Sequence, residues 1–296
     1  MTVLVSAALL AAVGLAAPVS AAPAPRGDAV VSGAPEKTCV VKPGADCRDV
    51  VHKWKLKHHG DLSRVRFARA QLHGADLRRA TLDRADFRGA VLVRAKLRGA
   101  SLRGANFGPA PRKMAPRATP SCQTNCQYAV LDGADLSGAD LTGVNFDNAS
   151  LVGANLAGAN LTNANLTSAA LNGANLTGAN LTGANLSYTL FYASNLTNAV
   201  LTGATVNDTD FYQATLTGVT SGRLVLVPAT LPSGWTWAIG YLVGPGANLM
   251  GANLAQWNLS GQDFTGANLS DANLQGSDLT GANMTGANLK GANLGG

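Results

Sequence analysis

Leu or Phe recurs at every fifth residue over most of this chain, and this spacing constrains the fold more than any other feature. The positions form runs of ten, eighteen and ten, which span 62–107, 131–216 and 249–294, and only Val206 and Met284 depart from Leu or Phe. A helix repeats every 3.6 residues and a strand every two, so either would scatter these side chains over several faces. The chain must therefore turn once per repeat to keep every Leu inward.

Four such turns close a square coil of twenty residues. The commonest repeat reads as in Gly173-Ala174-Asn175-Leu176-Thr177, and Ala lies two residues before the Leu or Phe in 29 of the 38 repeats. We expect Leu and Ala to point inward, whereas the Asn or Asp before Leu and the two residues after it point outward. Neighbouring coils then stack through backbone hydrogen bonds about 4.8 Å apart. Gly, two residues after Leu, tolerates the backbone angles of a corner.

These repeats resemble those of the pentapeptide-repeat family. The resemblance implies an all-β fold, a right-handed quadrilateral β-helix of about 9.5 coils in three runs. Low-complexity disorder is the alternative, and the strict register of Leu argues against it. A second resemblance, to secreted actinobacterial members of the family, is carried by Leu231-Pro232-Ser233-Gly234-Trp235 and the segment that ends at Leu249.

The three runs are out of phase with one another. Phe107 and Leu131 are 24 residues apart, and the Pro-rich and Cys-containing segment between them predicts a linker loop. Leu216 and Leu249 are 33 residues apart. That second interruption predicts a β-hairpin with strands Leu224–Val227 and Trp235–Leu242. Its aromatic side chains form a candidate interaction site, with packing against the solenoid as the alternative: Trp235, Trp237 and Tyr241.

The N-terminus predicts export. Val3 to Ala17 is an uninterrupted run of apolar and small residues, followed by a small-residue pattern suited to cleavage after Ala21 or Ala22. No Lys or Arg precedes the run, so an upstream start and an apolar tail of a cytosolic protein both stay open. No later stretch reaches the length of a membrane span. We expect a secreted chain without a transmembrane segment.

A short helix is expected at Asp46 to Lys57, with Asp46 as its N-cap, as a cap over the first coil. The predicted organisation runs in seven segments: signal peptide 1–22, N-terminal segment with capping helix 23–60, basic repeat run 61–108, linker loop 109–127, second repeat run 128–218, hairpin insert 219–245 and third repeat run 246–296. No cap follows the last repeat, so either the end frays or another chain covers it. The resemblance to a family whose members often dimerise through C-terminal coils implies a tail-to-tail homodimer, which we expect here.

Four cysteines fit an oxidising compartment and predict two disulfides, with three connectivities open: Cys39, Cys47, Cys122 and Cys126. The local pairing of Cys39 with Cys47 and of Cys122 with Cys126 is the simplest. A four-Cys metal site is the alternative, but the spacing does not match paired zinc ligands. We expect no metal and no cofactor.

Charge is distributed unevenly along the chain. Residues 1–126 carry 21 Lys and Arg against 8 Asp and Glu, whereas residues 127–296 carry 2 against 9. This balance predicts attraction of an extracellular polyanion or wall polymer to the first coils. A merely solvated face is the alternative. The candidate polyanion-binding residues are Arg64, Arg69, Arg78, Arg79, Arg84, Arg88, Arg94, Arg98 and Arg103.

The prediction is therefore a non-enzymatic scaffold or binding protein with an unknown macromolecular partner. All four His lie at or before His73 and no nucleophile motif is present, so no catalytic residue and no small-molecule substrate are expected. The family resemblance also implies an alternative, a DNA mimic that binds a type II topoisomerase such as gyrase. Nine acidic residues after Tyr128 are few for that role, because duplex DNA of the same length carries about 20 charges.

Overall fold

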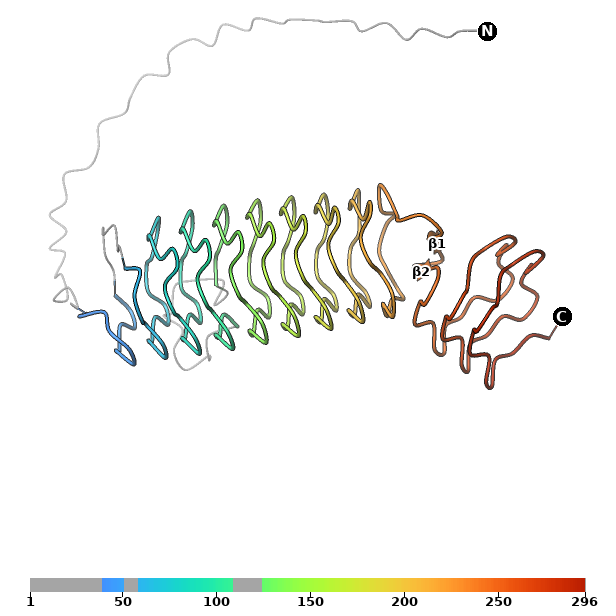
Figure 1. The fold of residues 1–296 in the computed structure, drawn as a ribbon, viewed down its shortest axis with the longest axis horizontal. Coiled ribbons are helices and arrows are strands. Elements are labelled where there is room, and N and C mark those ends of the chain that lie inside the picture. Colours follow the sequence, from blue (N-terminus) through green and yellow to red (C-terminus); the bar gives the residue numbers. More distant parts are fainter. Residues whose placement is uncertain (1–38, 51–57, 109–123, 296) are drawn as a thin grey trace, which may run out of the picture. The chain divides into compact units, whose positions relative to one another are not determined.

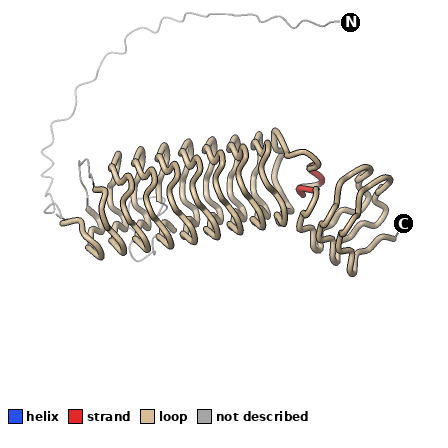
Figure 2. The backbone as a smooth tube through the Cα atoms, in the orientation of Figure 1, coloured by secondary structure: helices blue, strands red, loops and turns tan. Residues whose placement is uncertain are grey.

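The computed structural model describes residues 39–50, 58–108 and 124–295, and the predicted signal peptide lies outside this part of the chain. Within it the backbone winds as stacked coils, and only two three-residue strands occur, β1 (Thr236–Ala238) and β2 (Tyr241–Val243) (Figures 1 and 2). Elsewhere the coils are joined by single parallel bridges between residues twenty apart, such as Asn155 to Asn175 and Asn175 to Asn195. The predicted β-helical solenoid is confirmed.

Each repeat forms one side of a coil. At Leu176, the backbone N–H donates to the carbonyl of Asn195 in the next coil at 2.7 Å, and the N–H of Asn175 donates to Ala154 in the previous coil at 2.9 Å. Leu176 and Ala174 are at most 1% exposed. Because the Leu and Ala of each repeat face the axis, the fivefold spacing of Leu builds an apolar column, which the second interruption divides into two buried clusters.

Corners follow two residues after each inward Leu or Phe. The N–H of Ala174 donates to the carbonyl of Leu171 at 2.9 Å, which closes the turn. Gly173 at that corner has φ 64°, in the left-handed region where a Cβ is unfavourable. The repeat therefore favours Gly there for a conformational reason.

The Asn before Leu has a second role beyond facing outward. The side-chain oxygen of Asn175 accepts hydrogen bonds from the N–H of Thr177 at 3.1 Å and from its hydroxyl at 2.6 Å. The side-chain amide of Asn175 donates to Asn155 in the previous coil at 3.1 Å. These bonds form an Asx turn and an interlocked ladder, which explains the preference for Asn or Asp at this position.

Phenylalanines stack inside the solenoid where successive coils place them on the same side. The ring centroids of Phe87 and Phe107 are 4.7 Å apart, and those of Phe191 and Phe211 are 5.2 Å apart. All seven Phe of the chain are at most 2% exposed. The inward assignment of Leu and Phe is confirmed in the buried coils.

The helix expected at 46–57 is absent from its described part. Residues 46–50 form a coil side instead, because Asp46 bridges Arg66 and Asp49 has φ 59°. Cys47 and Val50 are buried, and Cys47 lies three repeats before Leu62 on the inward register. Residues 51–57 lie outside the described chain. The correction follows from the fivefold register, which begins earlier than the run of Leu.

The first interruption is an insertion at one corner. Bridges on either side of it join residues 34 apart, such as Val91 and Asn125, instead of twenty apart. The coil resumes at Thr124, four residues before the expected boundary. The Thr124 hydroxyl donates to the carbonyl of Phe87 at 3.0 Å and accepts from the N–H of Gly89 at 3.1 Å. This buried side chain fixes the chain where it re-enters the stack.

Cys126 corrects the expected second disulfide. Its side chain is buried on the inward register, five residues before Leu131, and it is a free thiol. Cys122 lies outside the described residues. Cys39 and Cys47 do form a disulfide, with their Cα atoms 5.3 Å apart. One half of the local pairing is therefore confirmed and the other half is wrong.

The second interruption contains a hairpin that is shorter than expected. β1 pairs antiparallel with β2, and Ile239 and Gly240 between them both have positive φ, as in a type I′ turn. Both strands overlap the segment predicted as the second strand, and β2 ends one residue beyond it. Leu224–Val227 is not a strand, because Val225 bridges Thr205 as part of a coil. Beyond the insert, Thr220 bridges Asn248 and the stack continues.

The final coil leaves part of its inward column accessible. Leu279, Met284 and Leu289 are half-buried, and Leu294 is 52% exposed. In the described residues no helix is long and apolar enough to cross a membrane. The tail-to-tail homodimer stays a prediction.

Candidate functional site

The arginines of the first run occupy two positions of each repeat. Arg78, Arg88, Arg98 and Arg103 directly follow an inward Leu or Phe, so each is the first of the two turn residues that end a side of the coil. The other candidates occupy corners, one residue further on: Arg64, Arg69, Arg79, Arg84 and Arg94. These two positions give the arginines different partners.

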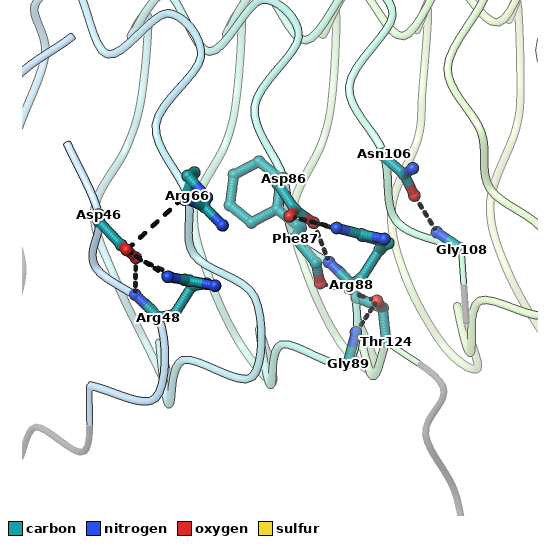
Figure 3. A network of polar contacts seen from close by, with 10 residues as sticks. All are labelled: Asp46, Arg48, Arg66, Asp86, Phe87, Arg88, Gly89, Asn106, Gly108 and Thr124. Carbon is teal, nitrogen blue, oxygen red and sulfur yellow. Dashed lines mark hydrogen bonds and ion pairs between the residues drawn. The ribbon is translucent and has the colours of Figure 1, made fainter. Parts of the chain in front are cut away.

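Each Arg that directly follows an inward Leu or Phe lies next to an Asp. Asp86 and Arg88 flank Phe87, and the Arg88 guanidinium lies 2.8 Å from the Asp86 carboxylate (Figure 3). Figure 3 also shows Asp46 between Arg48 and Arg66, which come from adjacent coils, at 2.5 and 3.6 Å. The pattern follows from the extended backbone, where residues i and i+2 point to the same face.

Further Asp–Arg pairs occur on two other faces of the coil. Arg78 lies 2.6 Å from Asp76, and hydrogen bonding from that guanidinium lowers the pKa of Asp76 to about 2. Arg103 lies 2.8 Å from Asp83, one coil earlier. Burial raises the pKa of Asp83, but hydrogen bonds from Ser101 and Arg103 outweigh it and lower the pKa overall. Much of the positive charge is therefore neutralised locally.

Two further candidates also have acidic partners. Arg69 pairs with Asp49 across adjacent coils, and Arg98 lies 2.7 Å from Asp132 across the first interruption. Hydrogen bonds to charged groups are stronger than neutral ones, but exposed pairs contribute little to stability because water screens them. The acidic partners of these arginines therefore reduce the charge that they offer to a ligand.

Four corner arginines make no ion pair with any residue that the structure describes: Arg64, Arg79, Arg84 and Arg94. Each has φ between 57° and 59°, where Gly or Asn is favoured. An Arg at such a corner costs about 1–2 kcal/mol relative to a relaxed backbone. Since residues twenty apart stack, Arg64 and Arg84 lie above one another along the same corner.

The structure brings some of these groups together around two hollows. One, of about 810 Å³, is lined by Arg64, Arg84, Arg103, Asp83 and Ser63, with Pro43 and Gly44 at its edge. The second, of about 570 Å³, is lined by His59, Arg78, Arg79 and Arg98. Arg88 and Arg69 flank Phe87 and Phe67 and line neither hollow. The candidate set therefore does not form one site.

The aromatic insert packs against the solenoid. Trp235, Trp237 and Tyr241 are all half-buried, and Trp235 contacts the buried residues on both sides of the insert. The hydroxyl of Tyr241 accepts from the N–H of Asn253 at 3.3 Å. These contacts give the aromatic residues a packing role.

A different aromatic set lies on the surface and was missed from the sequence. Tyr188, Tyr192 and Tyr212 are 51%, 45% and 52% exposed, and Leu190 is 42% exposed. The rings of Tyr192 and Tyr212 stack with centroids 6.0 Å apart. Their separation by twenty residues was the available signal, since that spacing places two residues in one column.

Chemistry beyond binding has little support in the described part of the chain. No group of three or more His, Cys, Asp or Glu there could hold a metal ion. The polar side chains are engaged in turns, ladders and ion pairs. The fold and surface thus define a repeat solenoid that presents side chains on flat faces.

Comparison with known proteins gives the family. The model of pentapeptide repeats matches in eight copies, over residues 59–83, 70–108, 123–158, 159–198, 179–218, 247–286 and 258–296. The chain belongs to the pentapeptide-repeat family. No sequence among the curated proteins matches it.

Solved structures of the same kind are similar to this chain. HetL, involved in heterocyst differentiation regulation in the cyanobacterium Nostoc sp. strain PCC 7120, is 30% identical over 79% of this chain and 89% of its own, with a TM-score of 0.26. Rfr23 from the cyanobacterium Cyanothece 51142 is 30% identical over 46% and 91%, with a TM-score of 0.22. QnrB1, a plasmid-mediated fluoroquinolone resistance protein, is 17% identical over 79% and 87%, with a TM-score of 0.26.

Proposed function

We propose that this protein is an exported, non-enzymatic scaffold whose first coils bind an extracellular polyanion, such as an anionic wall polymer. The observation that carries the proposal is the stacking of Arg64 and Arg84 along one corner without an acidic partner among the described residues. With Arg103 they border the larger hollow. The apolar run from Val3 to Ala17 supports export.

Geometry favours a chain-like anion over a small one. Arg64 and Arg84 are one coil apart, so their backbones repeat at about 4.8 Å. The hollow that they line is open, and Asp83 in its lining already accepts from Arg103 at 2.8 Å. A small anion would meet that carboxylate, whereas a polymer can lie across the rim and contact only the two corner guanidiniums.

The test measures binding to heparin, as a soluble polyanion, and to an anionic wall polymer, at low and high salt. Arg64→Asn with Arg84→Asn removes both charges at positions whose positive φ Asn tolerates, so the fold is preserved. We expect weaker binding and a shallower salt dependence, because fewer counterions are released. The control is Arg88→Gln on another face, which is compared with each corner substitution made singly, so that every variant compared lacks one positive charge.

Loss of binding in the single corner variants with retention in the Arg88→Gln protein supports the proposal. Equal loss in all three variants indicates attraction by overall charge and overturns the assignment to this corner. The implied alternative, gyrase binding, is tested in a supercoiling assay. Inhibition by the wild-type protein that survives the corner substitutions would favour that alternative.

A further inference from the structure

One face of the solenoid changes character along its length. We call it the Arg98 face, and it consists of the outward residues beside Leu77, Leu97, Leu131, Leu151, Leu171, Phe191 and Phe211. Parallel bridges join its successive coils through Lys96, Val130, Ser150, Ala170 and Leu190. The first coils of this face carry Arg, and the later coils carry exposed Tyr and Leu. The four exposed tyrosines of the described chain all lie on this face or along its edge: Tyr128, Tyr188, Tyr192 and Tyr212.

The basic and aromatic residues are placed symmetrically about Val152. In the column that follows the inward residues, Arg98, Asp132, Val152, Asn172 and Tyr192 occupy successive coils. The corner residue after each one donates its backbone N–H to the carbonyl of the next, as Gly99 does to Asp132 and Gly173 to Tyr192. Arg98 is two coils before Val152 and Tyr192 is two coils after it. One coil further out on either side, the same column carries Arg78 and Tyr212.

The edge of this face repeats the arrangement. Arg94 lies at the corner in the coil of Arg98, and Tyr188 lies at the same corner in the coil of Tyr192. Arg94 has no ion pair with any described residue, and Tyr188 is 51% exposed. Three arginines therefore match three tyrosines across one central coil.

We propose that the Arg98 face binds the same face of a second copy of this chain, antiparallel, with the twofold axis at the coil of Val152. This isologous arrangement sets Arg94, Arg98 and Arg78 of one copy against Tyr188, Tyr192 and Tyr212 of the other. A guanidinium over a tyrosine ring is attracted by the negative face of the ring, and more strongly where water is excluded. Twofold symmetry makes every such pair occur twice.

The remaining contacts of this arrangement are compatible with it. Val152, 40% exposed, meets its own copy at the axis, and Lys96 can lay its alkyl stem along Leu190. The side-chain oxygen of Asn172 is buried and accepts no hydrogen bond within the described chain, and the residue comes opposite Asp132. Asp76 comes opposite Asp210, and Asp76 is already paired with Arg78 at 2.6 Å.

The first test is sedimentation of the full chain over a wide range of concentration. We expect a dimer that Arg94→Glu weakens about tenfold, because two Arg–Tyr pairs are lost per interface. Adding Tyr188→Arg to Arg94→Glu should restore it by forming a Glu–Arg pair. The matched control is Arg84→Glu, another unpaired corner arginine on a different edge, which should leave the dimer unchanged.

The second test uses cross-linking near the axis. In a Cys122→Ser background, Val152→Cys should form a disulfide-linked dimer on mild oxidation, whereas Thr162→Cys on the opposite face should not, because the bond needs Cα atoms within about 7 Å. A monomer at every concentration overturns the proposal, as does equal weakening by Arg94→Glu and Arg84→Glu. A dimer lost only on Leu294→Asp overturns it in favour of the tail-to-tail arrangement.

Discussion

The Arg78 guanidinium lies 2.6 Å from the Asp76 carboxylate, and the two side chains flank the inward Leu77 on one face of a coil. Each Asp–x–Arg pair of the first run repeats this relationship. The pair consists of residues two apart, so its geometry is fixed by the extended coil side rather than by long-range folding. Its energetic signature should therefore be local and dependent on pH.

Removing the Asp76 carboxylate should lower the free energy of unfolding at neutral pH but not at strongly acid pH. The pKa of Asp76 is lowered to about 2, so its contribution is complete above the unfolded-state value of about 3.9 and disappears as the pH falls through 2. We expect Asp76→Asn to be less stable than wild type at neutral pH, with the difference shrinking between about pH 4 and pH 2. Urea unfolding across this range measures it. A difference that stays constant with pH would contradict the assignment.

A charge in the inward column should prevent cooperative folding. Leu161 is fully buried at mid-stack, and a buried carboxylate without a partner is strongly unfavourable. We expect Leu161→Asp to lose the cooperative thermal transition followed by circular dichroism. Thr162→Asp, one residue on and facing outward, is the control and should melt within a few degrees of wild type. Similar melts for both variants would refute the inward assignment.

A corner glycine should resist a methyl group for backbone reasons alone. Gly158 has φ 64°, and a Cβ added there would have no neighbour within 4 Å. We expect Gly158→Ala to lower the free energy of unfolding by about 1 kcal/mol, and Gly158→Asn to lower it less. Urea denaturation gives both values. Equal stability of the alanine variant and wild type would show that the corner relaxes.

The Cys126 thiol should be chemically silent in the folded protein. Complete burial raises its pKa and removes it from solvent. In a Cys122→Ser background, alkylation by iodoacetamide should proceed only in denaturant, as followed by mass spectrometry. Rapid labelling under native conditions would mean that the coil opens at Thr124, where the chain re-enters the stack.

The spacing of five was enough to predict the coil, because burial of Leu161 and its equivalents depends on register alone. Cys47 and Cys126 obey the same register, but Cys replaces the usual Leu there, so the sequence predicts a helix and a linker instead. The hairpin is shorter than predicted, because Val225 lies among residues that favour strands yet bridges Thr205 in the neighbouring coil. These misses are local substitutions within a correctly predicted framework.

The surface was harder to predict than the core. Arg88 and Arg64 are both arginines of the first repeat run. Only their position within the repeat distinguishes the paired Arg88 from Arg64, which has no ion pair with a described residue. The first interruption lies between Arg98 and Tyr192, and it separates bridged residues of neighbouring coils by 34 positions instead of twenty. The number of coils between Arg98 and Tyr192 therefore becomes known only once the bridge from Lys96 to Val130 is seen.

The chain leaves the stack after Gly108 and returns at Thr124 beside Phe87, so fourteen more residues than usual separate neighbouring coils at that point while the bridges beyond it recover their period of twenty. This corner of the solenoid thus accepts additional residues without changing the bridges between the coils on either side. The buried Thr124 hydroxyl, which bonds to the backbone of Phe87 and of Gly89, fixes the chain where it re-enters the stack. A peptide inserted between Gly108 and Thr124 should be displayed on an otherwise unchanged solenoid, which makes this corner a suitable insertion site.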